Sequence, residues 1–359
     1  MPKRSVSNPY YKQVYEELMH KINIGEIERE SYLPSEKELG SIFNVDRMTI
    51  RKALSMLVDE GLVEKRAGIG TFVKGTSVEG DNAKDINNIL IVFPNPDNTS
   101  EQIDHVFRSS LLFTAEKECR LMGYNSIFTQ DAKSSNLSDL TNGNKFKGIL
   151  FTSSVKMSLL QECLMSKTPA VIIDNVFEGI TSVISDNDSG IRQALRCFKA
   201  MGHTRIAFIT GAQSYYNADI RLASFKNAMS EMGLTFPKEY IGVGNWTYEG
   251  GSQAMKGFMR LAEPPTAVLS SNDAMAIGAI HSAQALGISV PEGVSVIGFD
   301  NIDRSEFTLP KLTTVNVELA AKIHIACMHL IDNIEKKIHA NCKITIPVQL
   351  VERDSVAKV

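Results

Sequence analysis

Short apolar runs separated by longer amphipathic stretches fill most of the chain after residue 86, and they constrain the fold more than any other feature. The runs are NILIVF, GYNSIFT, KGILFTS, PAVIIDN, RIAFITG, TAVLSSND and VSVIGFD. This alternation is typical of β-α-β units, in which parallel strands are buried and helices cover the sheet. Because the region is too long for one small sheet, the pattern predicts an α/β body of two lobes with parallel sheets.

Polar side chains follow several of these runs at the point where each strand is expected to end. Asp174 follows PAVII, Asn272 and Asp273 follow TAVLSS, and Asp300 ends VSVIGFD. Open parallel sheets bind ligands beyond the carboxyl ends of their strands, so these residues indicate a site for a polar ligand. Asp273 fits a structural role at the start of the next helix better than a ligand contact.

The sequence lacks the local motifs on which many enzymes and metalloproteins depend. It has no GxxxxGK, GxSxG or HExxH motif and no GxGxxG after a strand run. Its cysteines are scattered and never spaced as CxxC, and His324, Cys327 and His329 do not all share one helix face. We therefore expect no catalytic residue, no metal site and no cofactor.

No feature of the sequence points to a membrane. No apolar run approaches the roughly 18 to 20 residues needed to span a bilayer. The N-terminal stretch MPKRSVSNPYYKQ has no apolar segment behind its basic residues, so it does not have the pattern of a secretory signal. We expect a cytoplasmic protein without a membrane partner.

A different pattern precedes the body, with three helical stretches and a β-hairpin. Ser35 and Glu38 have the spacing of a capping box before the second stretch, Asp46 can cap the third, and Gly61 ends it. LVEKRAGIGTFV then gives two short β runs around a turn. Helix, turn, helix and wing form a small α+β unit whose third helix can lie in the major groove of DNA.

Two arginines, Arg47 and Arg51, open the third helical stretch. The planar guanidinium can donate two hydrogen bonds to guanine O6 and N7, so both residues are suited to base recognition. The charge balance is less decisive, because residues 1–78 hold 12 Lys and Arg against 11 Asp and Glu. From this pattern alone, a solvated helix face with two surface arginines is as good an interpretation as a DNA-binding face.

The segment from Leu33 to Val73, LPSEKELGSIFNVDRMTIRKALSMLVDEGLVEKRAGIGTFV, closely resembles the winged helix-turn-helix of the GntR family. The resemblance implies DNA contacts at Lys37, Arg47, Thr49 and Arg51 and at the wing tip from Gly68 to Gly70. Lys52, on the same arc of the third helix, is expected to support binding to all DNA sequences about equally. The usual serine before the first arginine is Asp46 here, which can cap a helix equally well but brings negative charge toward the phosphates.

Several pieces of the body resemble the sugar-binding core of the lactose-repressor (LacI/GalR) family, which is built like the periplasmic sugar-binding proteins. They are LMGYN, PAVIIDN, MGHTRIAFITG, PTAVLSSNDAMAIGAI, VPEGVSVIGFD and LPKLTTVNV. The resemblance implies two Rossmann-like lobes of the periplasmic binding protein-like I class. It also implies effector contacts at Phe93, Asn95, Asp174, Arg221, Trp246, Asn272 and Asp300.

The chemistry of these positions suits a sugar, although each position also has a structural interpretation. Asp174 and Asp300 can accept hydrogen bonds from hydroxyls, Arg221 and Asn272 can donate them, and Trp246 offers a flat apolar wall. Alternatively, Asp300 caps the segment after it, Trp246 belongs to the core, and Arg221 pairs on the surface with an acidic neighbour, Asp219 or Glu231.

The two resemblances together divide the chain into a head, a linker and a body. We expect a DNA-binding domain at residues 1–74, a linker at 75–85, and an effector-binding and dimerisation domain at 86–359. Within the body, lobe 1 is expected to comprise residues 86–185 and 317–346, and lobe 2 residues 186–316 and 347–359.

This combination resembles the bacterial arabinose-operon repressors. It implies a transcriptional repressor that binds a two-fold symmetric, double-stranded DNA operator as a homodimer. It further implies a small-molecule effector, a monosaccharide such as the pentose arabinose. Within this class, the alternative is a purine or another polar effector. Outside it, the alternative is a DNA-associated α/β enzyme, including the GntR relatives that carry an aminotransferase body.

Overall fold

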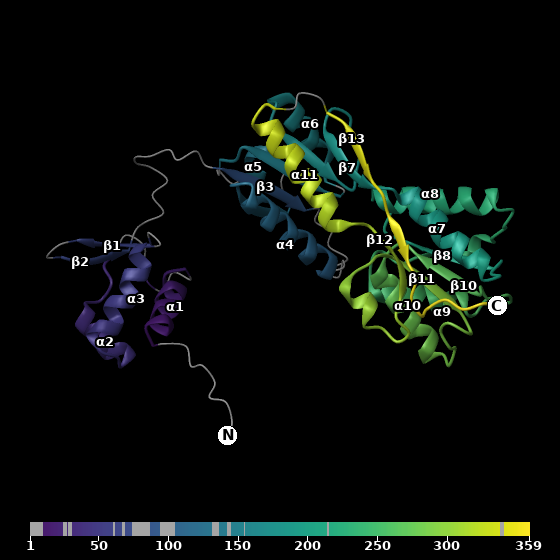
Figure 1. The fold of residues 1–359 in the computed structure, drawn as a ribbon, viewed down its shortest axis with the longest axis horizontal. Helices are drawn as coiled ribbons and strands as arrows, with labels where there is room; N and C mark the ends of the chain where they lie inside the picture. The colour runs from purple at the N-terminus through teal and green to yellow at the C-terminus, as the bar shows by residue number, and fades with distance from the viewer. Residues whose placement is uncertain are drawn as a thin grey trace, which may run out of the picture. The chain divides into compact units, whose positions relative to one another are not determined.

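The chain folds as two compact units, residues 1–84 and 85–359 (Figure 1). The computed structural model describes residues 10–23, 27, 31–59, 62–66, 69–73, 87–93, 105–130, 136–141, 145–153, 155–213, 215–337 and 341–359. The linker expected at residues 75–85 lies outside these described residues. Among the residues described, no helix is both long and apolar enough to cross a bilayer.

The first unit is a small α+β domain. Its described elements are α1 (Tyr10–Asn23), α2 (Glu36–Phe43), α3 (Arg47–Asp59) and the antiparallel strands β1 (Val63–Arg66) and β2 (Gly70–Val73). Apolar residues at helical spacing, such as Leu18 on α1 and Ile50 and Leu54 on α3, pack against Val63 and Val73 of the hairpin. This arrangement is the predicted winged helix-turn-helix.

Side-chain caps fix where α2 and α3 begin. The Ser35 hydroxyl accepts from the Glu38 backbone N–H at 3.3 Å, and the Glu38 carboxylate accepts from the Ser35 backbone N–H at 2.8 Å. This reciprocal pair confirms the predicted capping box. Asp46 accepts from the backbone N–H and the hydroxyl of Thr49, both at 2.9 Å, so Asp46 caps α3 as predicted.

One sheet of the body has the strand order β13-β7-β6-β5-β3-β4, and all its neighbouring strands are parallel. Its strands are β3 (Asn88–Phe93), β4 (Asn125–Gln130), β5 (Gly148–Thr152), β6 (Ala170–Ile173), β7 (Thr181–Ser185) and β13 (Lys343–Ile346). The apolar runs predict β3 to β6 correctly but not β7 or β13. We call this sheet and its helices lobe 1.

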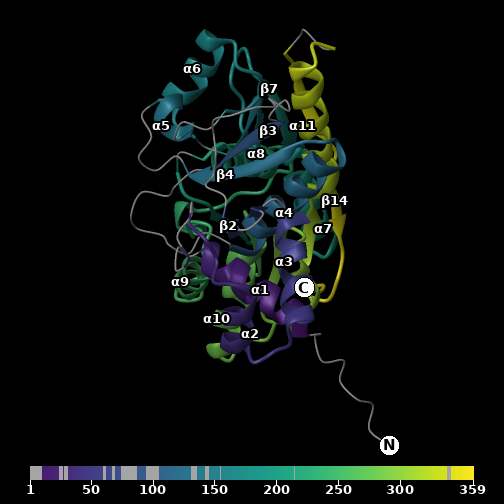
Figure 2. The same ribbon diagram turned by 90° about the vertical axis from the view of Figure 1, so that its left-hand side faces the viewer.

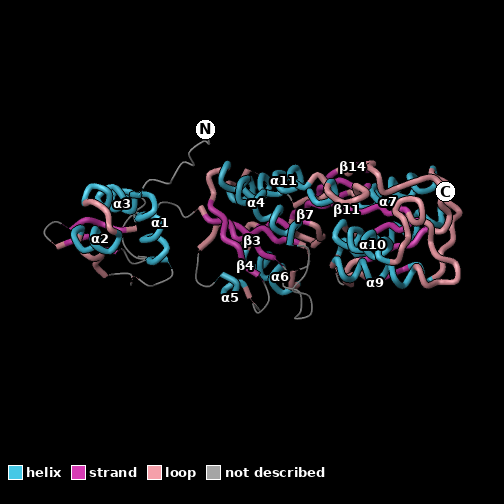
Figure 3. Tube along the Cα trace, turned by 90° about the horizontal axis from the view of Figure 1, so that it is seen from below, coloured by secondary structure: helices cyan, strands magenta, loops and turns pink. Residues whose placement is uncertain are grey.

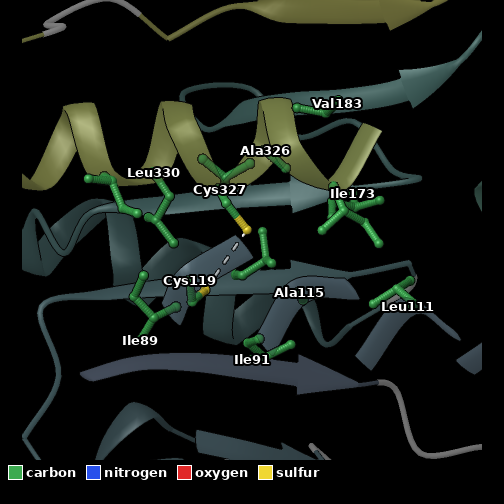
Figure 4. Packing of buried hydrophobic residues seen from close by; sticks show 14 of the residues in the cluster. Ile89, Ile91, Leu111, Ala115, Cys119, Ile173, Val183, Ala326, Cys327 and Leu330 are labelled. Atoms are coloured by element: carbon green, nitrogen blue, oxygen red, sulfur yellow. Dashed lines mark hydrogen bonds between the residues drawn. The ribbon is translucent and has the colours of Figure 1, made fainter. Parts of the chain in front are cut away.

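Helices cover both faces of the lobe 1 sheet. Figures 2 and 3 show α5 (Leu137–Thr141) and α6 (Met157–Ser166) on the face opposite α11 (Leu319–Ile334). On the α11 side, α4 (His105–Leu121) and α11 enclose a cluster of buried apolar residues against the sheet (Figure 4). In this cluster the Sγ atoms of Cys119 and Cys327 face each other at 3.9 Å.

The second sheet, with its helices, forms lobe 2. Its strand order is β14-β12-β11-β10-β8-β9, parallel throughout except where β14 pairs with β12. The strands are β8 (Ile206–Thr210), β9 (Ile241–Val243), β10 (Ala267–Ser270), β11 (Ser295–Asp300), β12 (Thr313–Asn316) and β14 (Gln349–Val351). Helices α7 (Asn187–Ala200) and α8 (Tyr216–Glu231) pack on one face, and α9 (Tyr248–Phe258) and α10 (Asp273–Ala285) on the other.

The chain passes from one lobe to the other after β7, after β12 and after β13. Figure 1 shows the last crossing as the yellow segment that runs from β13 toward the strands of lobe 2. Two short 3-10 helices, η1 (Lys238–Tyr240) and η2 (Asp303–Glu306), complete the described elements of lobe 2. Two α/β lobes with parallel sheets confirm the predicted fold class, with β14 as an added antiparallel edge.

Candidate effector pocket and nucleic-acid interface

A pocket in the body is lined by residues of both lobes. The lining comprises Phe93, Phe107, Arg108, Leu111, Thr152, Ser153, Asp174, Tyr215, Asn217, Arg221, Trp246, Asn272 and Asp300. The structure thus brings together all the predicted effector residues except Asn95, which lies outside the described residues. They sit at the carboxyl ends of strands or in the loops and helices that follow them, where parallel sheets bind ligands. What they bind stays a prediction.

The lobe 1 wall of the pocket is built around a buried ion pair. Asp174 follows β6 with a left-handed φ of 56°, and its carboxylate accepts from Lys322 Nζ at 2.8 Å and 2.9 Å. Lys322 belongs to α11 and also donates to the Ser185 hydroxyl at 3.0 Å. Lys322 is 1% exposed and Asp174 is 5% exposed, so the attraction between the two charges must offset the cost of removing both from water.

The lobe 2 wall is held by Arg221, which is buried and not on the surface. Its Nε donates to the Asn187 side-chain oxygen at 2.8 Å, and Nη1 donates to the Ser271 carbonyl. Both terminal nitrogens lie 3.4 Å from Asp300 Oδ1, and the guanidinium stacks 3.7 Å from the Phe299 ring centroid. Burial lowers the pKa of Arg221 and the neighbouring Asp300 opposes this effect, while the guanidinium stays protonated.

Asn272 and Trp246 are positioned by one short network. The Asn272 side chain caps α10 by accepting from the Met275 N–H at 2.9 Å, and it donates to the Trp246 carbonyl at 3.2 Å. The Trp246 ring lies so close to Gly211 that a Cβ there would be 2.2 Å from two of its carbons. The buried indole N–H has no hydrogen-bond partner among the described residues, which costs free energy while it stays unpaired.

Asp273 and Asp300 have different roles although both follow strands of lobe 2. Asp273 is fully buried and accepts from the Thr314 hydroxyl at 2.5 Å and from the Ile302 N–H at 2.9 Å. These contacts hold the loop after β11, which agrees with the structural role expected for Asp273. Asp300, with φ of 109°, instead faces Arg221 in the pocket.

Arg108 is a pocket residue that the sequence analysis missed. It lies in the first turn of α4, is half-buried, and stacks 5.3 Å from the Phe93 ring centroid. Burial lowers the pKa of Arg108, with Tyr215 acting in the opposite direction. No local motif distinguishes this arginine from the solvated residues of an amphipathic helix, and the same is true of Lys322 on α11.

The candidate DNA-binding face of the head presents most of its predicted residues to solvent. Arg47 Nε and Arg51 Nε both donate to Glu36 Oε2, at 2.8 Å and 2.9 Å, so α2 holds the two arginines side by side. The hydrogen bond from Arg47, together with the one from Arg51, lowers the pKa of Glu36. Lys52 Nζ lies 3.9 Å from the Tyr11 ring centroid on α1.

The remaining predicted DNA contacts differ in what the structure shows of them. Lys37 and Gly70 are exposed, and Gly68 lies outside the described residues. The Thr49 hydroxyl is engaged by Asp46, which stands where the GntR family usually has serine. A DNA contact by the Thr49 hydroxyl therefore requires this cap to rearrange.

Two of the three possible metal-binding side chains of α11, His324 and Cys327, contact other residues. His324 Nδ1 lies 2.7 Å from a Glu118 carboxylate oxygen, and Cys327 packs against Cys119 in the lobe 1 core. In the described residues, no three His, Cys, Asp or Glu side chains converge as a metal site would require.

Comparison with known proteins identifies both parts of the chain. Residues 10–73 match the family described as bacterial regulatory proteins, gntR family, and residues 195–356 match a periplasmic binding protein-like domain. A LacI family transcriptional regulator from Enterococcus faecium, solved with bound ribose, has the same body fold, with a TM-score of 0.66 and 24% identity over 75% of this chain and 99% of that one. The chain joins a GntR-type head to a LacI-type body.

The curated relatives of this GntR-headed chain match it in part. It is 30% identical over 219 residues to the probable HTH-type transcriptional repressor ExuR of Bacillus subtilis (strain 168), covering 60% of this chain and 66% of that protein. It is 37% identical over 150 residues to the HTH-type transcriptional repressor CytR of Escherichia coli (strain K12), covering 41% of this chain and 44% of CytR. The chain thus spans less than two thirds of the length of these relatives.

Proposed function

We propose that this chain is a DNA-binding transcriptional repressor whose operator binding is controlled by a small sugar. One observation carries the proposal: a pocket lined by both lobes gathers hydroxyl-binding groups in a chain whose head holds two arginines on an exposed helix face. We place the protein in the cytoplasm, where it acts as a homodimer. A two-fold dimer presents two heads to a two-fold symmetric operator.

A monosaccharide suits the groups around the pocket. Asp174 and Asp300 offer carboxylate oxygens to hydroxyls, and the Trp246 indole offers an apolar surface to a sugar ring. The resemblance to arabinose-operon repressors makes a pentose such as arabinose the first candidate. The Enterococcus faecium regulator with bound ribose supports the same class of ligand.

The sugar can control operator binding because its pocket is lined by both lobes. A sugar that contacts both lobes shifts the body between its open and closed forms by the difference between its affinities for the two. We propose that the sugar-bound form of the body weakens operator binding by the heads.

A thermal-shift screen of the full chain tests this effector class. Arabinose, ribose, glucose and galactose are compared with the purines guanine and hypoxanthine, since a ligand that binds only the folded state raises the apparent stability. At least one sugar is expected to raise the unfolding midpoint of the body. A response to purines alone would favour a purine effector. Chemical conversion of a bound sugar would instead favour a DNA-associated α/β enzyme.

A further inference from the structure

The positively charged side chains around the pocket differ in whether a carboxylate of the protein neutralises them. Lys322 gives both of its shortest contacts to the two carboxylate oxygens of Asp174. Arg221 is held by Asp300, by the Asn187 side chain and by the Ser271 carbonyl. Lys322 and Arg221 are therefore neutralised by carboxylates of the protein, so neither cation has unpaired charge to attract an anion. Asp174 and Asp300 can still accept hydrogen bonds.

Arg108 is different. Within the described part of the chain no carboxylate pairs with its guanidinium, which instead lies over the Phe93 ring. Burial disfavours its charged form and lowers its pKa, so the structure maintains a half-buried positive charge at some energetic cost. A wall that only had to contact an apolar sugar face needs no charge at this position.

We infer that the effector is a monosaccharide bearing one anionic group, a carboxylate or a phosphate, and that Arg108 binds this group. The inference rests on the proposed function but replaces arabinose, its neutral first candidate, with an anionic sugar. A guanidinium donates two parallel hydrogen bonds to either anion, and these charge-assisted bonds are stronger away from bulk water. Hydroxyls elsewhere on the sugar are bound by Asp174 and Asp300, and the Trp246 ring packs against an apolar face of the sugar.

Calorimetry on the full chain tests the inference with ligands that differ only at C6. D-glucose, D-glucuronate and D-glucose 6-phosphate form one series, D-galactose, D-galacturonate and D-galactose 6-phosphate form a second, and L-arabinose is the neutral pentose. In at least one series the anionic sugar is expected to bind about tenfold or more tightly than its neutral parent. The better of the two anions identifies whether a carboxylate or a phosphate occupies the site.

Variants on α4 separate the role of Arg108 from general effects. Arg108→Gln is expected to lower the ratio of anionic to neutral affinity by about tenfold or more, because it removes a charge-assisted contact. Arg120→Gln is the matched control, because Arg120 lies on the same helix with its side chain 72% exposed and paired with Glu116. It should leave the affinity ratio unchanged. Added salt should weaken binding of the anionic sugar more than binding of its neutral parent.

The outcomes separate this inference from the regulatory proposal. If arabinose or a neutral hexose binds best, if Arg108→Gln retains the preference for the anion, or if no anionic sugar binds, the inference is wrong. If an Arg108-dependent anionic sugar binds but leaves the affinity for DNA unchanged, the inference stands and the proposed control of operator binding is wrong.

Discussion

At the scale of single residues, Glu36 explains how the head positions Arg47 and Arg51, the two arginines that we propose read bases. Its carboxylate lies between Arg47 and Arg51 and accepts from both, although their side chains are 68% and 48% exposed. An exposed ion pair adds little stability, so the contribution of Glu36 is to orient two long side chains. The charge of Glu36 also offsets part of theirs, which helps explain why the charge balance of the head is a weak predictor of DNA binding.

Arg51→Ala is expected to cost roughly 1 to 3 kcal/mol of specific DNA binding and to relax the preference at one base pair in each half-site. The physical reason is the loss of the two hydrogen bonds that we propose Arg51 donates to a guanine. Lys52→Ala is the matched control on the same helix and should weaken binding to all sequences about equally. Selection from a random DNA pool measures both effects. An unchanged preferred sequence for Arg51→Ala would show that α3 does not read bases there.

The buried pair of Asp174 and Lys322 provides a second test at this scale. Asp174→Asn leaves the Lys322 ammonium buried without a counter-charge, so it should destabilise the body by about 3 to 5 kcal/mol. The double variant Asp174→Asn with Lys322→Met removes both charges and should recover most of that loss. Urea unfolding measures the difference. Equal stability of the single and double variants would mean that the pair is not coupled.

At the scale of secondary-structure elements, α9 and α10 pack at backbone contact, and this contact positions the pocket. A Cβ on Gly278 of α10 would lie 2.0 Å from the Tyr248 carbonyl oxygen, and one on Gly251 of α9 would lie 2.0 Å from the Met275 carbonyl oxygen. Because Asn272 caps α10, a shift of α10 moves a residue of the pocket wall.

Gly278→Ala is therefore expected to destabilise lobe 2 by about 1 to 3 kcal/mol and to weaken effector binding, since the helices must separate to admit the methyl group. Gly257→Ala, near the end of α9 where a Cβ would meet nothing within 4 Å, is the matched control. It should be neutral or stabilise by up to about 1 kcal/mol. Thermal unfolding and calorimetry together check this prediction, and equal effects of the two substitutions would contradict it.

Strands that carry their own apolar run were predictable from the sequence, and elements or side chains defined by distant partners were not. β3 and β11 are long apolar runs, whereas β13 begins with an exposed lysine and exists because it pairs with β7, far away in the sequence. The polar strand ends at Asp174 and Asp300 predicted the pocket for the same local reason. Arg108 and Lys322 face the pocket or its wall only because of how α4 and α11 dock, which no local pattern encodes.

At the scale of the whole molecule, the C-terminal segment is tied to lobe 2 through a buried histidine. His203 Nε2 lies 3.0 Å from the Ala357 carbonyl oxygen, and Nδ1 lies 2.9 Å from the Thr266 hydroxyl. Burial lowers the pKa of His203 below its ordinary value of 6.5. The unfolded chain therefore binds more protons than the folded one as the pH falls.

The stability contributed by neutral His203 should be fully present above about pH 6.5 and be lost as the pH falls below that value toward the folded-state pKa. Carboxylates titrate mostly below this window. The unfolding midpoint of the natural chain should thus fall more steeply between about pH 7 and pH 5 than that of His203→Gln. Equal slopes for the two proteins would exclude His203 as the source of the pH dependence.

Control of operator binding by the sugar is tested by the affinity of the full chain for its selected operator, measured by fluorescence anisotropy with and without the sugar found by calorimetry. In the natural chain, saturating sugar should weaken operator binding by about 1 to 3 kcal/mol, the usual range of coupling between two sites. In Arg221→Ala, with its folding verified by thermal unfolding, operator affinity without sugar should be unchanged and the response to sugar lost. If the natural chain binds the sugar in this pocket and holds its operator with undiminished affinity, the sugar does not control operator binding.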